Sequence, residues 1–313
     1  MSVLLGARTV RVIDCHCHLG PMEWAVPTAP ACMFDVEGLL AEQARAGVDI
    51  SVFGNNWIRA PEGLSTLEAM RRYNEFAAEV TARHPNHLAG LASAVPFGGD
   101  DYLVEVERAV HDLGLKGIMI NTSVAGEYLD SPRARPFFEL VTRLDLPVFI
   151  HPPRSTIGAE KMDIFRLPEM VGRPFDTTLS LARFMLTGGF ERFPSLKLVC
   201  AHMGGAISLL PGRLDFGYEL RDDPSFGPWE PDVLSAPPAA HIARLYLDTM
   251  GFHPPAVLCC VGTVGASHVV MGSDFPPVHV PVARTVDLVR QLPLSMEDRE
   301  AILGGNAARL LGI

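Results

Sequence analysis

The chain has 313 residues, of which 48% are hydrophobic, and its formal net charge is −10 at pH 7. A chain of this length and composition can bury a large core, and its acidic balance argues against nucleic acid as a partner. No uninterrupted apolar run reaches the length of a membrane span, and the first nine residues contain Arg8 and no convincing signal-peptide cleavage site. Six cysteines without disulfide-framework or zinc-ribbon spacing predict reduced thiols, and hence a cytoplasmic protein.

The first predicted strand carries two histidines near its C-terminal end. The apolar run 10–13 leads directly into a segment that contains His16 and His18. Because strand side chains alternate between faces, both imidazoles point the same way. Two neutral imidazoles on one face form half of a site for a divalent ion such as zinc, although two histidines at a sheet edge can also be ordinary polar residues.

The same alternation places the neighbouring polar residues of this strand. Asp14 is expected on the histidine face but deeper, as a carboxylate that orients the ligands or as a structural residue. Cys15 and Cys17 are expected to face the helical layer. They are therefore interpreted as small buried side chains and not as ligands of a mixed Cys/His site.

Three later apolar runs also end in a His or an Asp. The terminal residues are His151, His202 and Asp274. Short apolar runs bounded by Pro or Gly are typical of buried parallel strands, whose C-terminal ends meet at the face where α/β enzymes keep their chemistry. We therefore expect all three residues close to the histidine pair. The alternatives are a buried His202 satisfied by the backbone, and an Asp274 that caps a helix before a Phe-Pro dipeptide.

Four further candidate strands bring the number to eight, and helical patterns alternate with them. These strands are expected at 48–54, 88–96, 117–122 and 244–249. Helices are expected at 36–46, 100–113, 136–144 and 179–185, three of them closed by a glycine. Eight strands alternating with helices predict a single α/β domain over residues 1–313, a (β/α)8 TIM barrel with a helical insertion between strands five and six.

With these motifs the chain resembles the amidohydrolase-related metal enzymes, and most closely the branch that contains aminocarboxymuconate semialdehyde decarboxylase. The resemblance spans nearly the whole chain and rests on segments 14–19, 151–152, 201–205, 272–276 and 302–311, with a further similarity over 172–178 and 188–197. It implies one divalent ion, zinc or manganese, and a homodimer. The ligands would be His16, His18, His151 and Asp274. His202 would lie close to the ion as an acid or base, a task that suits an imidazole.

Some amidohydrolase-type sites hold two metals bridged by a carboxylated lysine at the end of strand four. Lys116 precedes that strand, and the strand's end at 121–123 offers only neutral polar groups. A site for one metal ion is therefore favoured.

The substrate contacts rest on fewer observations. Arg213, eleven residues beyond His202, matches a position that binds a substrate carboxylate in the resembling decarboxylases, and a surface salt bridge is its alternative. Further candidates at the rim are Trp24, Arg154, Phe175 and His253. The decarboxylase pattern also has an arginine in the first loop, where residues 24–36 contain none. A smaller or less charged acid, such as an aromatic one, therefore fits this chain.

Two reactions remain open for this metal site. In the first, the enzyme decarboxylates a small aromatic or unsaturated carboxylic acid, and His202 supplies the proton. In the second, a metal-activated water hydrolyses an amide, lactone or C–C bond, with Asp274 or His202 handling the proton. A barrel that only binds a ligand would show a gap in the ligand set, and the sequence shows none. The 172–178 segment and Arg213 favour decarboxylation.

Overall fold

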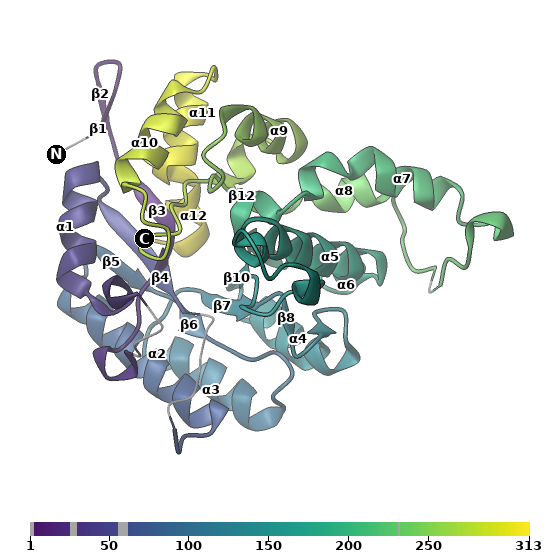
Figure 1. Ribbon diagram of the computed structural model, residues 1–313, viewed down its shortest axis with the longest axis horizontal. Coiled ribbons are helices and arrows are strands. Elements are labelled where there is room, and N and C mark those ends of the chain that lie inside the picture. Colours follow the sequence, from purple (N-terminus) through teal and green to yellow (C-terminus); the bar gives the residue numbers. More distant parts are fainter. Residues whose placement is uncertain (1–2, 26–29, 56–61, 231) are drawn as a thin grey trace.

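Parallel strands form two sheets in this protein, whose computed structural model describes residues 3–25, 30–55, 62–230 and 232–313 (Figure 1). The six-stranded sheet has the order β13-β12-β11-β10-β7-β6, and the three-stranded sheet has the order β3-β4-β5. The strands are β3 (Ile13–His18), β4 (Ile50–Gly54), β5 (Leu88–Gly90), β6 (Ala92–Ser93), β7 (Ile118–Asn121), β10 (Pro147–His151), β11 (Lys197–Cys200), β12 (Tyr246–Asp248) and β13 (Val269–Val270). All eight predicted strand positions hold strands, and segment 88–96 contains both β5 and β6.

The two sheets are hydrogen-bonded to each other at both edges. On one side Leu91 links β5 to β6, and its N–H donates to the carbonyl of Phe53 in β4 at 2.8 Å. On the other side the N–H of Cys15 donates to the carbonyl of Met271, and that of His18 to the carbonyl of Phe275, both at 2.8 Å. Strand β3, the first of the parallel strands, therefore lies next to the segment that follows β13.

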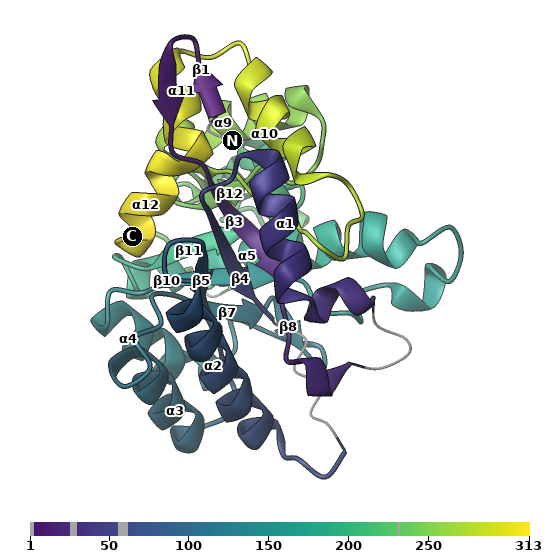
Figure 2. The ribbon, with the colours of Figure 1, turned by 90° about the vertical axis from the view of Figure 1, so that its left-hand side faces the viewer.

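Helices cover the strands from outside (Figures 1 and 2). They are α1 (Val36–Ala46), α2 (Thr66–Arg83), α3 (Asp100–His111), α4 (Arg135–Arg143), α5 (Arg173–Leu186), α6 (Gly189–Arg192), α7 (Pro211–Glu219), α8 (Pro238–Ile242), α9 (Pro254–Val264), α10 (Val282–Gln291), α11 (Met296–Glu300) and α12 (Asn306–Leu311). Local sequence sets their ends: the Asp35 side chain caps α1, Gly47 ends it at a φ of 72°, and Ser65 with Glu68 forms a capping box at α2. No helix among the described residues is both long and apolar enough to cross a bilayer.

Two short antiparallel hairpins were not predicted. One pairs β1 (Val3–Leu5) with β2 (Arg8–Val10), and the other pairs β8 (Ser123–Val124) with β9 (Glu127–Tyr128). Strands of two or three residues are too short for alternation to be recognised in a sequence.

Each parallel strand is buried on both faces, which explains why it appears as a continuous apolar run. The inner face forms a cluster of side chains from neighbouring strands and from α12: Ile13, Cys15, Ile50, Val52, Leu91, Met119, Phe149, Val199, Val270, Ala307, Leu310 and Leu311. The other face packs against the helices in a larger core.

Strand β3 contains one extra residue near its middle. Its register with β4 pairs Asp14 with Ser51 and Cys17 with Phe53, so three steps along β3 face two along β4. A bulge of this kind breaks the alternation of side chains. Cys15 therefore belongs to the inner cluster, whereas Cys17 packs in the outer core. The expectation that both thiols face the helical layer is wrong for Cys15.

Candidate metal centre

Four buried side chains converge at the C-terminal ends of the strands. His16 and His18 come from β3, His151 ends β10, and Asp274 follows β13. One ligand atom from each lies within 4.8 Å of all the others. The Nε2 atoms of His16 and His18 are 3.2 Å apart, and Asp274 Oδ1 lies 3.0 Å from His18 Nε2. Imidazole nitrogens with a carboxylate oxygen are a ligand set typical of zinc and similar divalent ions.

The other ring nitrogens of these histidines are held by acceptors, which orients the rings. Nδ1 of His18 donates to the carbonyl of Gly54 at 3.2 Å, and Nδ1 of His151 donates to the carbonyl of Pro152 at 2.9 Å. A carbonyl oxygen can only accept, so both Nδ1 atoms carry the proton. The Nε2 atoms of both rings then present their lone pairs to the cluster, and the donor set fits a divalent ion.

His16 is held in the same way by a residue that sequence reasoning missed. Its Nδ1 lies 2.6 Å from Oδ2 of Asp248, which ends β12. Asp248 ends a predicted apolar strand, as His151 and His202 do, and this position is the signal that could have identified it.

Charge and burial shift the pKa values of the cluster residues in different directions. Burial lowers the pKa of His18, and burial together with the neighbouring histidines lowers that of His151 well below its usual value. Burial also acts to lower the pKa of His16, but the charges of Asp274 and Asp248 outweigh it and raise this pKa to about 9. Burial acts to raise the pKa of Asp274, yet the surrounding histidines hold it well below the usual value. The metal-free cluster therefore contains an ionised Asp274 and a protonated His16.

His202 lies beside this cluster, and its ring centroid is 5.2 Å from that of His16 and 4.9 Å from that of His151. Its Nε2 is 3.2 Å from Oδ2 of Asp274, and only 8% of the residue is exposed. His202 and the following Met203 both have left-handed backbone, with φ values of 54° and 59°. Its Nδ1 is buried without a hydrogen-bond partner among the described residues. The side chain is thus placed next to the candidate ligands and is not one of the four.

Asp14 differs from its predicted position. It lies on the opposite side of β3 from the two histidines, where Cys17 Sγ donates to it at 3.1 Å and Ser273 Oγ at 2.5 Å. It also accepts from the backbone N–H groups of His16 and Ser273. Burial raises the pKa of this carboxyl. Because of the bulge, Asp14 holds together the two segments that bear His16, His18 and Asp274, and it does not share a face with the two histidines.

The family model described as amidohydrolase matches residues 13–313. The chain belongs to the amidohydrolase family. This amidohydrolase is 29% identical over 293 residues to 2-amino-3-carboxymuconate-6-semialdehyde decarboxylase of Dictyostelium discoideum, an alignment that covers 90% of this chain and 77% of that protein. The resemblance stated from the motifs is thereby confirmed.

Solved structures of similar fold include two decarboxylases. The 5-carboxyvanillate decarboxylase of Sphingomonas paucimobilis superposes with a TM-score of 0.84 and 26% identity over 97% of this chain and 100% of that chain. A dihydroxybenzoic acid decarboxylase of Polaromonas, solved with manganese and the inhibitor 2-nitroresorcinol, gives a TM-score of 0.82 and 22% identity over 97% of each chain. The fold of the amidohydrolase is therefore that of these proteins.

The predicted substrate contacts of the amidohydrolase differ in their exposure. Trp24 is buried in the outer core, 6.4 Å from the ring of Tyr73. The side chains of Arg154, Phe175, Arg213 and His253 are exposed. The structure brings the candidate ligands and His202 together, and the substrate roles of the other five residues stay predictions.

Two further basic residues bear on the site. Lys116 is exposed and precedes β7. Arg173, partly buried at the start of α5, was not predicted: burial lowers its pKa, while the charge of Asp274 acts to raise it. The first turn of α5 therefore adds a positive charge to the surroundings of the cluster.

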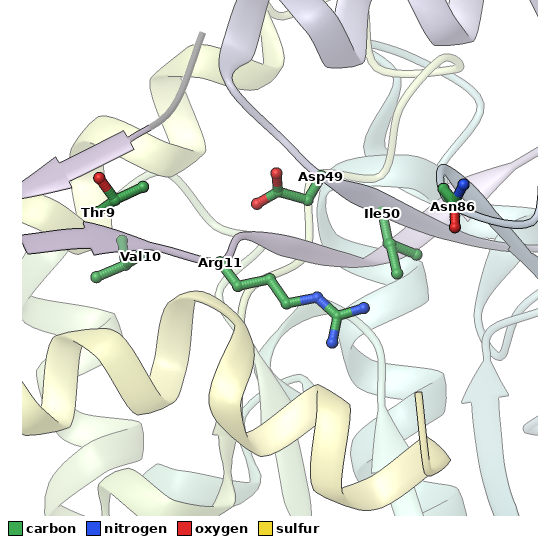
Figure 3. Close-up of a pocket in the computed structure, with 6 residues that line it drawn as sticks. All are labelled: Thr9, Val10, Arg11, Asp49, Ile50 and Asn86. Atoms are coloured by element: carbon green, nitrogen blue, oxygen red, sulfur yellow. The ribbon is translucent and has the colours of Figure 1, made fainter.

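A hollow of about 400 Å³ lies at the opposite, N-terminal ends of β3 and β4 (Figure 3). It is lined by Thr9, Val10, Arg11, Asp49, Ile50 and Asn86. A much smaller cavity of about 10 Å³, with room for about one water molecule, lies directly beneath the cluster and is lined partly by His16, His151 and Asp248. The lining of the larger hollow contains no histidine or cysteine and only one carboxylate, that of Asp49.

Proposed function

We propose that this amidohydrolase is a metal-dependent, non-oxidative decarboxylase of a small aromatic or unsaturated carboxylic acid. The observation that carries the proposal is a buried site of three histidines and Asp274, with the imidazole of His202 at 3.2 Å from the Asp274 carboxylate. The decarboxylases to which the chain is similar support the choice of reaction. A small-molecule acid is accordingly the proposed partner.

The site belongs, in this proposal, to one closed (β/α)8 barrel formed by residues 1–313, with a helical insertion between the fifth and sixth strands. The hydrogen bonds that join the two sheets at both edges support closure. The segment between β10 and β11, which contains α5 and α6, supports the insertion. Residues His16, His18, His151 and Asp274 would hold one zinc or manganese ion.

Such an ion would act as a Lewis acid that orients the substrate and stabilises negative charge on its oxygens. The protein's own contribution is the proton. When the bond to the carboxyl carbon breaks, CO2 leaves without the bonding electrons, and the electron pair stays on the ring or alkene carbon. His202 Nε2 donates a proton to that carbon and is reprotonated from solvent. The burial of the cluster keeps competing water away.

Arg213, Trp24, Arg154, Phe175 and His253 remain the proposed substrate contacts. A homodimer is also proposed, and the exposure of Leu209 and Phe216, at 74% and 45%, supports a second copy as partner. The cytoplasm stays the proposed compartment, in line with six free cysteines.

Hydrolysis of an amide, lactone or C–C bond is the alternative, because the same ligand set can activate a water molecule. The test begins with elemental analysis of the purified protein. The metal-replete enzyme is then assayed for CO2 release from 2,6-dihydroxybenzoate, 5-carboxyvanillate and related acids, and for hydrolysis of lactones and amides. One ion per chain with CO2 release supports the proposal. Metal without CO2 release but with hydrolysis favours the alternative, and the lack of metal after loading contradicts both.

A further inference from the structure

Asp248 accepts four hydrogen bonds at the end of β12, where it is only 2% exposed. Its Oδ2 lies 2.6 Å from Nδ1 of His16 and 3.1 Å from the backbone N of His202. Its Oδ1 lies 2.7 Å from the N of Met203 and 3.1 Å from the N of Met250. Since a carboxylate offers about four acceptor sites, each of them is filled.

The donors that surround Asp248 determine whether Nδ1 of His16 carries a proton. Three are backbone N–H groups, which can only donate, so both oxygens of Asp248 act as acceptors. The short contact of Oδ2 with His16 then needs a donor, so Nδ1 of His16 carries a proton. Its Nε2 therefore faces the cluster as the atom available to a metal.

Two of the three backbone donors belong to the turn that presents His202, and the third, Met250, follows β12. His202 and Met203 both adopt left-handed φ, a conformation that non-glycine residues keep only when their surroundings enforce it. Asp248 binds the N–H groups of both residues, while Asp274 binds the ring of His202 at 3.2 Å. The imidazole is thus held from its backbone by one carboxylate and at its ring by the other.

We propose that Asp248 is a positioning residue that couples the candidate metal ligand His16 to the acid–base residue His202. The Asp248 carboxylate sets the tautomer of His16 and holds the backbone of His202. The position of a bound ion relative to the proton donor would therefore be fixed. The inference rests on the proposed function for the role of His202, but its geometry does not depend on the identity of the substrate.

The test is Asp248→Asn. Whichever way the amide is turned, its NH2 group faces two of the four donors, so it removes at least two hydrogen bonds. We expect zinc affinity to fall about 10-fold to 100-fold, the usual effect of losing a carboxylate behind a metal-bound histidine. We also expect amide hydrogen exchange in segment 201–206 to rise about 10-fold, because either the N–H of His202 or that of Met203 loses its acceptor, depending on which way the amide is turned.

A matched control is Asp176→Asn in α5. Asp176 is also buried and accepts four hydrogen bonds, from Thr122 Oγ1, Ser123 Oγ, Tyr128 Oη and the N–H of Ile157. It contacts none of the cluster residues through these bonds. We expect this variant to lose stability but to retain zinc affinity and slow exchange in segment 201–206.

Zinc affinity is measured by competition with a chromophoric chelator, and exchange by mass spectrometry. Neither measurement needs turnover, so a failure of the decarboxylase proposal is distinguishable from a failure of this one. If the Asp248→Asn and Asp176→Asn variants have the same zinc affinity and the same exchange in segment 201–206, the proposed coupling through Asp248 is wrong. If affinity falls and exchange in 201–206 does not change, Asp248 serves His16 alone, and the coupling is again wrong.

A second variant covers the case in which Asp248→Asn does not fold. A Cβ added at Gly272 would lie 2.8 Å from the Cβ of His16 and 3.0 Å from that of Asp248. Gly272→Ala therefore pushes this pair apart without removing a polar group. We expect lower zinc affinity and faster exchange in segment 201–206, and unchanged values of both would contradict the proposal.

Discussion

A proton on His16 competes with a metal ion for the cluster at neutral pH. The charges of Asp274 and Asp248 raise the pKa of His16 to about 9, whereas the pKa values of His18 and His151 are lowered. Zinc must therefore displace one proton below pH 9, and none from the other two rings. We expect the zinc Kd to fall about 10-fold per pH unit between pH 7 and pH 8.5, and to level off above pH 9.

The same chelator competition, repeated at each pH, measures this dependence. A Kd that does not change between pH 7 and pH 8.5 would mean that His16 is already neutral in the metal-free protein. A slope of log Kd against pH that corresponds to two or more released protons would mean that a second histidine is protonated as well.

Alanine substitutions distinguish the candidate ligands, whose loss should remove zinc binding, from His202, whose loss should remove activity. His16→Ala with His18→Ala should abolish zinc binding and leave a folded α/β protein, because both changes remove ligand atoms at one end of β3. His202→Ala should retain zinc and lower CO2 release about 10²-fold to 10⁴-fold, the usual contribution of a general acid. Elemental analysis and the decarboxylase assay measure the two effects. Full metal content in the double variant would refute the site, and loss of metal from His202→Ala would make His202 a ligand.

The residues of the cluster could be predicted because each ends an apolar run, and strand ends meet at one face. Asp248 ends a run too, but its role depends on a partner 232 positions away in the sequence. Asp14 and Cys15 were misplaced because alternation assumes a regular strand. The extra residue in β3 is defined by its pairing with β4, which the sequence of β3 alone does not contain.

The first turn of α5 packs against the turn that follows β11, and Gly205 makes this contact possible. Its φ is 69°, and an added Cβ would lie 2.1 Å from the carbonyl oxygen of Pro174. Gly205→Ala is therefore expected to lower the free energy of unfolding by about 2–4 kcal/mol through overpacking and left-handed strain. It should also reduce CO2 release, because the displaced turn carries His202.

Urea unfolding at saturating zinc measures the change. Gly212→Ala in α7 is the control, since nothing lies within 4 Å of an added Cβ there and alanine favours a helix by up to about 1 kcal/mol. Equal stability of the two variants would show that the contact between α5 and the turn is not tight.

The long elements of the fold were predictable and their ends less so. The helix expected from 179 begins at Arg173, because a π-helical turn at Pro168–Gly172 leads directly into it. The two short hairpins have no pattern that distinguishes them from loops. Element type thus follows from periodicity, whereas these boundaries depend on contacts made in the folded chain.

The whole molecule brings the two ends of its sequence together around the site. The N-terminal strands lie beside the C-terminal helices in both views (Figures 1 and 2). Backbone hydrogen bonds join His16 to Asp274 and His18 to Phe275. The candidate ligands come from three parts of the chain, at residues 16–18, 151 and 274. An ion held by these four residues would therefore link the beginning, middle and end of the fold.

This arrangement predicts that zinc stabilises the entire fold. A ligand that binds only the folded state at 1,000 times its Kd contributes about 4 kcal/mol, and none of these ligands is near another in an unfolded chain except His16 and His18. With roughly 2.1 cal/mol/K of unfolding entropy per residue, the expected rise in Tm is about 6 °C. Scanning calorimetry of metal-free and zinc-loaded protein measures it. The variant that lacks His16 and His18 should show no zinc-dependent rise, and an equal rise in that variant would place the stabilising ion elsewhere.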